Sequence, residues 1–87
     1  MIETILDLGD PMLIAVALVT ALASKAAEFS TTELRTLSFI NDRRMPAGSV
    51  SFAGVRLRAR EELVKRGRWR LADQLRAWFS PGDELHP

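Results

Sequence analysis

Few side chains in this chain of 87 residues have the type and spacing that catalysis needs. The chain has no cysteine, and its single histidine, His86, is the penultimate residue, so no serine has a histidine partner that could activate it. Glu61 and Glu62 are adjacent on an expected helix and point in different directions. Ion pairs of these two glutamates with Lys65 and Arg66, four positions further on, explain their presence better than acid–base catalysis does. We therefore expect no enzyme activity, no cofactor and no metal site.

Arginine is the residue type that stands out. The stretch 50–79 contains seven of the ten arginines and both tryptophans. The planar guanidinium group suits recognition of carboxylates or phosphates, and tryptophan among arginines is typical of an interface hot spot. A run of charges is also typical of a solvated helix face, and a GC-rich genome produces the same preference for arginine. The partner-binding residues that we predict are Arg56, Arg58, Arg60, Lys65, Arg66, Arg68, Trp69 and Arg70.

The charges are segregated along the chain. Residues 1–34 contain one basic and five acidic side chains, whereas residues 35–78 contain eleven basic and four acidic side chains. Such segregation indicates either an anionic partner for the second part or a fold that pairs its own halves. The net charge of only +1 favours a protein partner with an acidic surface over nucleic acid.

The two tryptophans have different expected environments. Trp69 is expected to be the exposed anchor of the basic surface, although packing across the turn at Gly67 is an alternative. Trp78 shares one arc of an expected helix with Leu71 and Leu75, which predicts that it lies in the core.

An unusually apolar helix is expected over residues 11–29. Asp10 stands at the N-cap position and Pro11 at the first helical position. Because apolar residues surround most of its circumference, this helix must be covered on several sides. It is either the central core helix or, in part, the seam of a symmetric homodimer, and we predict a homodimer. The seam residues that we predict are Leu18, Val19 and Leu22.

The same segment is not expected to cross a membrane. Its apolar run, residues 12–23, is shorter than the roughly 20 residues that a bilayer needs. Acidic rather than basic residues precede it, which is unlike a signal peptide. The lack of cysteine fits a reducing compartment, so we expect a cytoplasmic protein without membrane contact.

Further helices are expected on both sides of a loop at residues 41–49. Residues 2–8 form a short helical turn, and Ser30 to Glu33 spell a capping box for a helix over 31–41. A helix over 50–66 that ends at Gly67 and another over 68–79 follow, and residues 80–87 form a polar tail. Residues 50–59 also alternate as a hairpin would around Ala53-Gly54, which would give an α+β fold resembling a winged helix.

The predicted fold is therefore all-α, a single domain of four helices packed around the apolar first helix. Its predicted core consists of Ile14, Leu18, Leu22, Leu37, Ile40, Phe52, Val55, Leu63, Leu75 and Trp78. The predicted function is that of a small regulatory protein that binds a macromolecular partner, most simply another protein. The alternative is a DNA-binding regulator of the helix-turn-helix or winged-helix type, because a capped helix, a loop and a basic helix follow one another.

Overall fold

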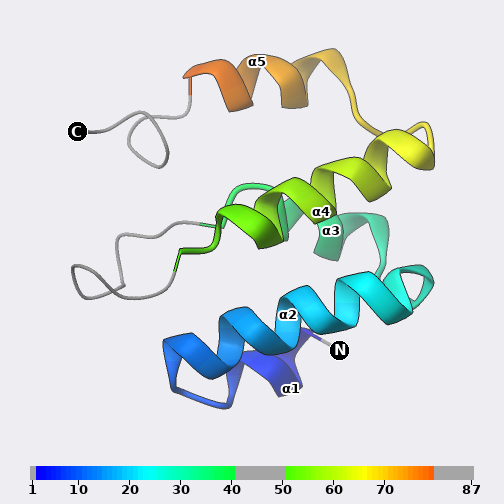
Figure 1. The fold of residues 1–87 in the computed structure, drawn as a ribbon. Coiled ribbons are helices and arrows are strands. Elements are labelled where there is room, and N and C mark those ends of the chain that lie inside the picture. The colour runs from blue at the N-terminus through cyan, green and yellow to red at the C-terminus, as the bar shows by residue number, and fades with distance from the viewer. Residues whose placement is uncertain (1, 41–50, 80–87) are drawn as a thin grey trace.

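The computed structural model describes residues 2–40 and 51–79, and both ranges are helical without any strand (Figure 1). The elements are α1 (Ile2–Leu6), α2 (Pro11–Lys25), the 3-10 helix η1 (Ala26–Glu28), α3 (Thr31–Leu37), α4 (Ala53–Lys65) and α5 (Leu71–Phe79). The all-α prediction is confirmed. The alternative hairpin around Ala53-Gly54 is wrong, because α4 begins at Ala53. The predicted helix start near residue 50 is too early, because Ser51 and Phe52 precede the helix, and the predicted tail at 80–87 lies outside the described residues.

The predicted helix starts are confirmed where the sequence spells a cap. The Asp10 carboxylate accepts the backbone N–H of Met12 at 2.8 Å, with Pro11 at the first helical position. Ser30 and Glu33 form the complete capping box, in which each side chain accepts the backbone N–H of the other residue, at 3.0 and 2.8 Å. These contacts satisfy N–H groups that a helix start leaves without partners.

The end of α4 is fixed by glycine. Gly67 has a φ of 71°, a left-handed conformation that glycine adopts without steric cost. The N–H of Gly67 donates to the carbonyl of Val64 at 2.9 Å, and that of Arg68 donates to Leu63 at 2.8 Å. This pair of bonds is the Schellman motif, which reverses the chain and leads it towards α5.

All four predicted helices are shorter in the structure: α2 ends at Lys25, where η1 follows, and α4 spans Ala53–Lys65. For α3 and α5, charged side chains explain the difference. α3 ends at Leu37 rather than near residue 41, and the carbonyls of Ser38 and Ile40 beyond it accept hydrogen bonds from arginines of α4. α5 begins at Leu71 rather than at residue 68, because the carboxylate of Asp73 accepts the backbone N–H of Arg70 at 2.9 Å. A side chain at the third helical position that binds back in this way marks a helix start.

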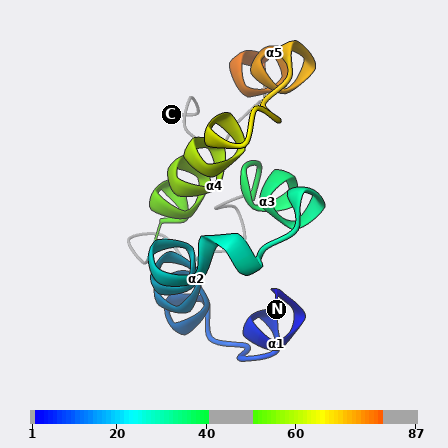
Figure 2. The same ribbon diagram turned by 90° about the vertical axis from the view of Figure 1, so that its right-hand side faces the viewer.

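The helices are arranged in sequence from one end of the molecule to the other. α4 packs against both α2 and α3, and α1 packs against α2. Figures 1 and 2 both place α5 beyond α4, at the end opposite to α1 and α2. α5 makes no comparably extensive helix–helix contact within the described ranges. It is therefore the outermost element of the fold.

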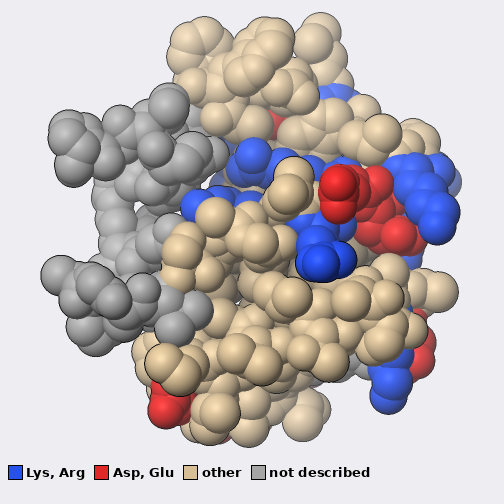
Figure 3. Space-filling model, in the orientation of Figure 1, with Lys and Arg blue, Asp and Glu red and all other residues tan. Residues whose placement is uncertain are grey.

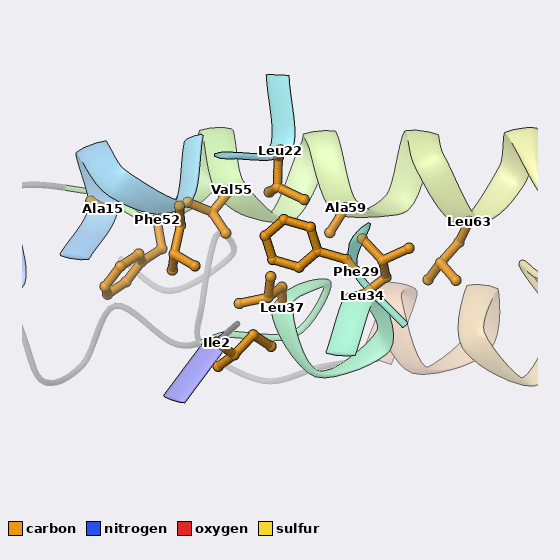
Figure 4. Close-up of a cluster of buried hydrophobic side chains, with 11 residues drawn as sticks. Ile2, Ala15, Leu22, Phe29, Leu34, Leu37, Phe52, Val55, Ala59 and Leu63 are labelled. Carbon is orange, nitrogen blue, oxygen red and sulfur yellow. The ribbon is translucent and has the colours of Figure 1, made fainter. Parts of the chain in front are cut away.

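The core lies between α2, α3 and α4 and surrounds Phe29 (Figure 4). Phe29 is 1% exposed, and Leu34, four positions after the N-cap, is completely buried beside it in the same cluster. Most of the predicted core is confirmed, whereas Ile14 and Ile40 are only partly buried at its edge. The buried residues are Ile2, Ala15, Leu18, Leu22, Phe29, Leu34, Leu37, Phe52, Val55, Ala59 and Leu63. Leu75 and Trp78 do not belong to it, because both face solvent.

The residues of α2 that were predicted to form a dimer seam pack within the single chain. Leu18 and Leu22 are buried within the single chain, and Val19 is packed against the edge of the core. In this fold neither Leu18 nor Leu22 is accessible to a second copy, which corrects their assignment to a dimer seam. The opposite side of α2 remains exposed instead, at Met12, Leu13 and Val16.

The segment Pro11–Glu28, which comprises α2 and η1, is long and apolar enough to cross a membrane by length and composition, and only 17% of it is buried. Its 18 residues lie within the range of known spans, which makes the length argument against a span weaker than the sequence suggested. A core helix of a soluble protein meets the same criterion.

Candidate interaction surface

The arginines of α4 mostly face the protein rather than solvent. Arg56 is 4% exposed and donates to the carbonyl of Ile40 at 2.9 Å. Arg60 donates through Nε to the carbonyl of Ser38, also at 2.9 Å. Both carbonyls lie just beyond α3, where the partial negative charge of a helix end attracts cations. Arg56 and Arg60, which the sequence placed in a partner-binding surface, thus hold α4 against the end of α3.

Arg66 has the same role at the other end of α4. Its two terminal nitrogens donate to the carbonyls of Phe29 and Ala26, each at 2.8 Å, and its Nε pairs with Glu62 at 2.9 Å. The planar guanidinium fork makes three hydrogen bonds in different directions at once. The predicted ion pair with Glu62 is therefore present, and Arg66 joins α4 to η1.

A second polar cluster attaches α5, and its centre is Asp73. The carboxylate, 3% exposed, accepts hydrogen bonds from Nε of Arg35 in α3 at 3.1 Å and from the guanidinium group of Arg70 at 3.2 Å. Arg35 also donates to the carbonyl of Arg68 at 2.6 Å. The Arg70 side chain, then its backbone N–H and Arg35, hold the pKa of Asp73 far below its ordinary value against the opposing effect of burial.

Trp69 lies in a stack rather than on an open surface. Its ring is 5.9 Å from that of Phe39 with an interplanar angle of 19°, and its Nε1 donates to Gln74 at 2.9 Å. The guanidinium group of Arg76 lies 4.0 Å from the Phe39 ring centroid, and that of Arg60 lies 5.8 Å from the Trp69 ring. Trp69 thus packs across the turn at Gly67, the alternative that the sequence had left open, and it is the partly buried tryptophan.

Four of the predicted binding residues remain on the surface. Arg58, Lys65 and Arg68 are exposed, and their side chains form no ion pair with another described residue. Arg70 is also largely exposed, although it pairs with Asp73. In Figure 3 the charged groups gather across the middle of the face, over α4, whereas the surface over α5 is almost free of charge.

The apolar side of α5 faces solvent. Asp73 is the buried residue of this helix, and its apolar residues lie on the opposite side. We call these residues the α5 face: Leu71 (73% exposed), Leu75 (41%), Trp78 (60%) and Phe79 (77%). An amphipathic helix of a globular protein normally turns its apolar stripe towards the core, so this orientation leaves an apolar patch uncovered. Sequence periodicity had identified the stripe correctly but not its direction.

A groove of about 320 Å³ runs beside this helix, between α4 and α5. It is lined by Arg60, Glu61, Val64, Trp69, Gln74 and Ala77. Val64 is 60% exposed, so the apolar surface extends from the groove onto α4. The groove has hydrogen-bonding groups of both charge signs on partly apolar walls.

Within residues 2–40 and 51–79, no group of three acidic or histidine side chains is arranged to hold a metal ion. Comparisons with protein-family models, with curated proteins and with solved structures found no match to this chain.

Proposed function

We propose that this chain is a non-enzymatic interaction protein that binds another protein through the α5 face. The observation that carries this proposal is the inverted orientation of α5, with Asp73 inside and Trp78 and Phe79 outside. Exposed aromatic residues beside arginines are the composition of binding hot spots. The proposed surface is therefore α5 with the neighbouring groove, rather than the α4 arginines that the sequence indicated.

The rim of the α5 face defines the chemistry of its partner. Arg68, Arg70 and Arg76 are exposed around it, and the acidic residue of this helix, Asp73, is buried and paired. A complementary protein surface combines apolar side chains with an acidic rim, since opposite charges guide association and exclude partners of like charge. The partner is thus a protein with an acidic, partly apolar docking surface.

Binding to nucleic acid receives less support from the same contacts. Phosphate binding requires several accessible cations, and Arg56, Arg60 and Arg66 donate to backbone carbonyls instead. A basic apolar helix also suits an anionic membrane surface. The adjacent groove with Glu61 and Gln74 adds polar contacts that are useful to a protein partner but not to anionic lipid.

Capture from a lysate of the native host tests the proposal when it is made with matched variants. Trp78→Gln together with Phe79→Gln removes the aromatic part of the α5 face, and Ala27→Gln is the control, because Ala27 is exposed in η1, away from α5 and the groove. We expect a protein that is captured in the presence of nuclease, retained by the control and lost with the double variant. Capture that disappears with nuclease would support the DNA-binding alternative. Equal capture by wild type and double variant would refute the α5 face.

Vesicles that contain anionic lipid provide the remaining comparison. The proposal predicts that wild type and double variant co-sediment with them equally weakly. Strong binding that the double variant loses would assign the α5 face to a membrane surface instead.

A further inference from the structure

The end of the molecule opposite to α5 has a second exposed apolar surface. We call it the α1–α2 face, and its residues are Leu6 (44% exposed), Leu8 (49%), Met12 (56%), Leu13 (53%) and Val16 (58%). They come from α1, the turn after it and the first turns of α2, which pack against each other. Figures 1 and 2 show that α1 and α2 lie at the end of the fold opposite to α5.

The two faces have rims of opposite charge. Glu3, Asp7 and Asp10 are exposed beside the α1–α2 face, and residues 1–24 contain no lysine or arginine. Within the segment 68–79 the exposed charged residues beside the α5 face are all basic, namely Arg68, Arg70 and Arg76, while Glu61 of α4 lines the neighbouring groove. Each face thus has the composition that the other requires: apolar side chains surrounded by the opposite charge.

From this complementarity we infer that the chain associates with itself head to tail, with the α5 face of one copy on the α1–α2 face of the next. The inference rests on the proposed function, since it takes the α5 face as a protein-binding surface and identifies one of its partners. Pairing of two α5 faces would bring arginines against arginines, and pairing of two α1–α2 faces would bring carboxylates together. The rims therefore favour the heterologous arrangement over a symmetric dimer.

The geometry determines how such an assembly grows. A heterologous contact leaves one free face of each kind at the ends, so association continues beyond the dimer unless a ring closes. Each face has only four or five partly exposed apolar residues, whereas a stable interface uses about 20–30 residues on each side. Association is consequently weak, rises with protein concentration and falls as salt screens the two rims.

A mixing experiment with two full-length variants tests the arrangement. One variant, Leu71→Gln with Trp78→Gln, removes the α5 face, and the other, Met12→Gln with Val16→Gln, removes the α1–α2 face. All four residues are more than half exposed, and circular dichroism checks that both variants remain folded. Sedimentation velocity then measures the mass of wild type, of each variant and of their equimolar mixture at high micromolar concentration.

Head-to-tail association predicts one pattern of masses. Wild type exceeds the dimer mass as its concentration rises, each variant alone stays monomeric, and the mixture forms a dimer that does not grow, because one intact face of each kind remains. Ala27→Gln is the control, an exposed substitution away from both faces, and it should behave as wild type. A variant without the α1–α2 face that still dimerises alone would show symmetric α5 pairing and overturn the inference. A monomeric wild type would overturn it as well.

The failure of this inference is distinguishable from that of the proposed function. If Met12→Gln with Val16→Gln captures the host protein normally and wild type stays monomeric, the α5 face binds a different protein. If the variant without the α5 face captures as wild type does, the proposed function itself is wrong.

Discussion

The carboxylate of Asp73 in α5 lies 3.1 Å from Nε of Arg35 in α3, an ion pair between residues that are 38 positions apart. α5 lacks extensive packing against the other helices within the described ranges, so it is held by this contact, by the hydrogen bond from Trp69 to Gln74 and by Arg76 over the Phe39 ring. Because Asp73 turns inward, the opposite side of the helix must turn outward. One buried carboxylate thereby sets which surface the molecule presents.

Replacement of Asp73 by asparagine is expected to loosen α5 without unfolding the rest. It removes the charge that holds two guanidinium groups, and hydrogen bonds to charged groups contribute about 1.5–3 kcal/mol each. Hydrogen exchange should show faster exchange of the α5 amides and unchanged protection in α4. Asp7→Asn is the control, since Asp7 is exposed. Unchanged protection of α5 in the Asp73 variant would show that the ion pair does not hold the helix.

The same carboxyl group predicts how the attachment depends on pH. Its pKa is lowered in the folded chain from an ordinary value of 3.8, so its stabilising effect is complete above that value and is lost as the pH falls below it. We expect constant protection of α5 between about pH 5 and 8, where the carboxylate is charged in both states. Below about pH 4 the difference between wild type and Asp73→Asn should shrink. A difference that persists in strong acid would contradict the assignment.

Arg66 and Arg58 form a matched pair on α4, one bound by the fold and one exposed. Arg66→Lys should destabilise the protein by roughly 1.5–3 kcal/mol, because a lysine ammonium group cannot reach two backbone carbonyls and Glu62 in the planar geometry of the guanidinium fork. Arg58→Lys should change stability by less than about 0.5 kcal/mol. Urea unfolding measures both. Equal midpoints would show that the contacts of Arg66 do not stabilise the fold.

These contacts show why the sequence predicted some features and not others. The caps at Asp10 and Ser30 and the turn at Gly67 depend on residues within a few positions, and local patterns identified them correctly. The roles of Arg56 and Arg60 depend on carbonyl groups 16 and 22 residues away, which no local pattern reveals. The run of arginines that was interpreted as a binding surface thus partly forms hydrogen bonds that hold α4 to the end of α3.

For the same reason, the sequence could not show whether the apolar side of α5 faces the core or solvent. Spacing of apolar residues shows that a stripe exists, but only the distant partner of Asp73 determines whether the stripe faces the core. The exposure of Trp69 and Trp78 was therefore predicted in reverse, whereas the core positions of α2 and α4 were mostly correct. Asp73, which lies between Arg70 and Arg76 in the sequence, indicates an internal ion pair. The spacing of apolar residues alone takes no account of such a pair.

The two tryptophans provide an optical test of that reversal. In Trp69→Phe the remaining Trp78, 60% exposed, should show red-shifted emission and strong quenching by acrylamide. In Trp78→Phe the remaining Trp69, stacked on Phe39 and bonded to Gln74, should be the less accessible to the quencher. The reverse order would place Trp78 in the core and refute the exposed α5 face. A partner bound to the α5 face should protect Trp78 specifically.

Two phenylalanines test the same division between core and surface by stability. Phe29 is 1% exposed at the centre of the cluster in Figure 4, and Phe79 is 77% exposed at the end of α5. Truncation of a buried phenylalanine costs about 3–5 kcal/mol through lost burial and a residual cavity. A natural domain has a free energy of unfolding of only about 5–15 kcal/mol. Phe29→Ala should therefore leave the protein barely folded. Phe79→Ala should shift stability by no more than about 0.5 kcal/mol, because that ring is already in water. Chemical denaturation of both variants measures the contrast, and a large loss in Phe79→Ala would mean that the α5 face is covered within the single chain rather than by a partner.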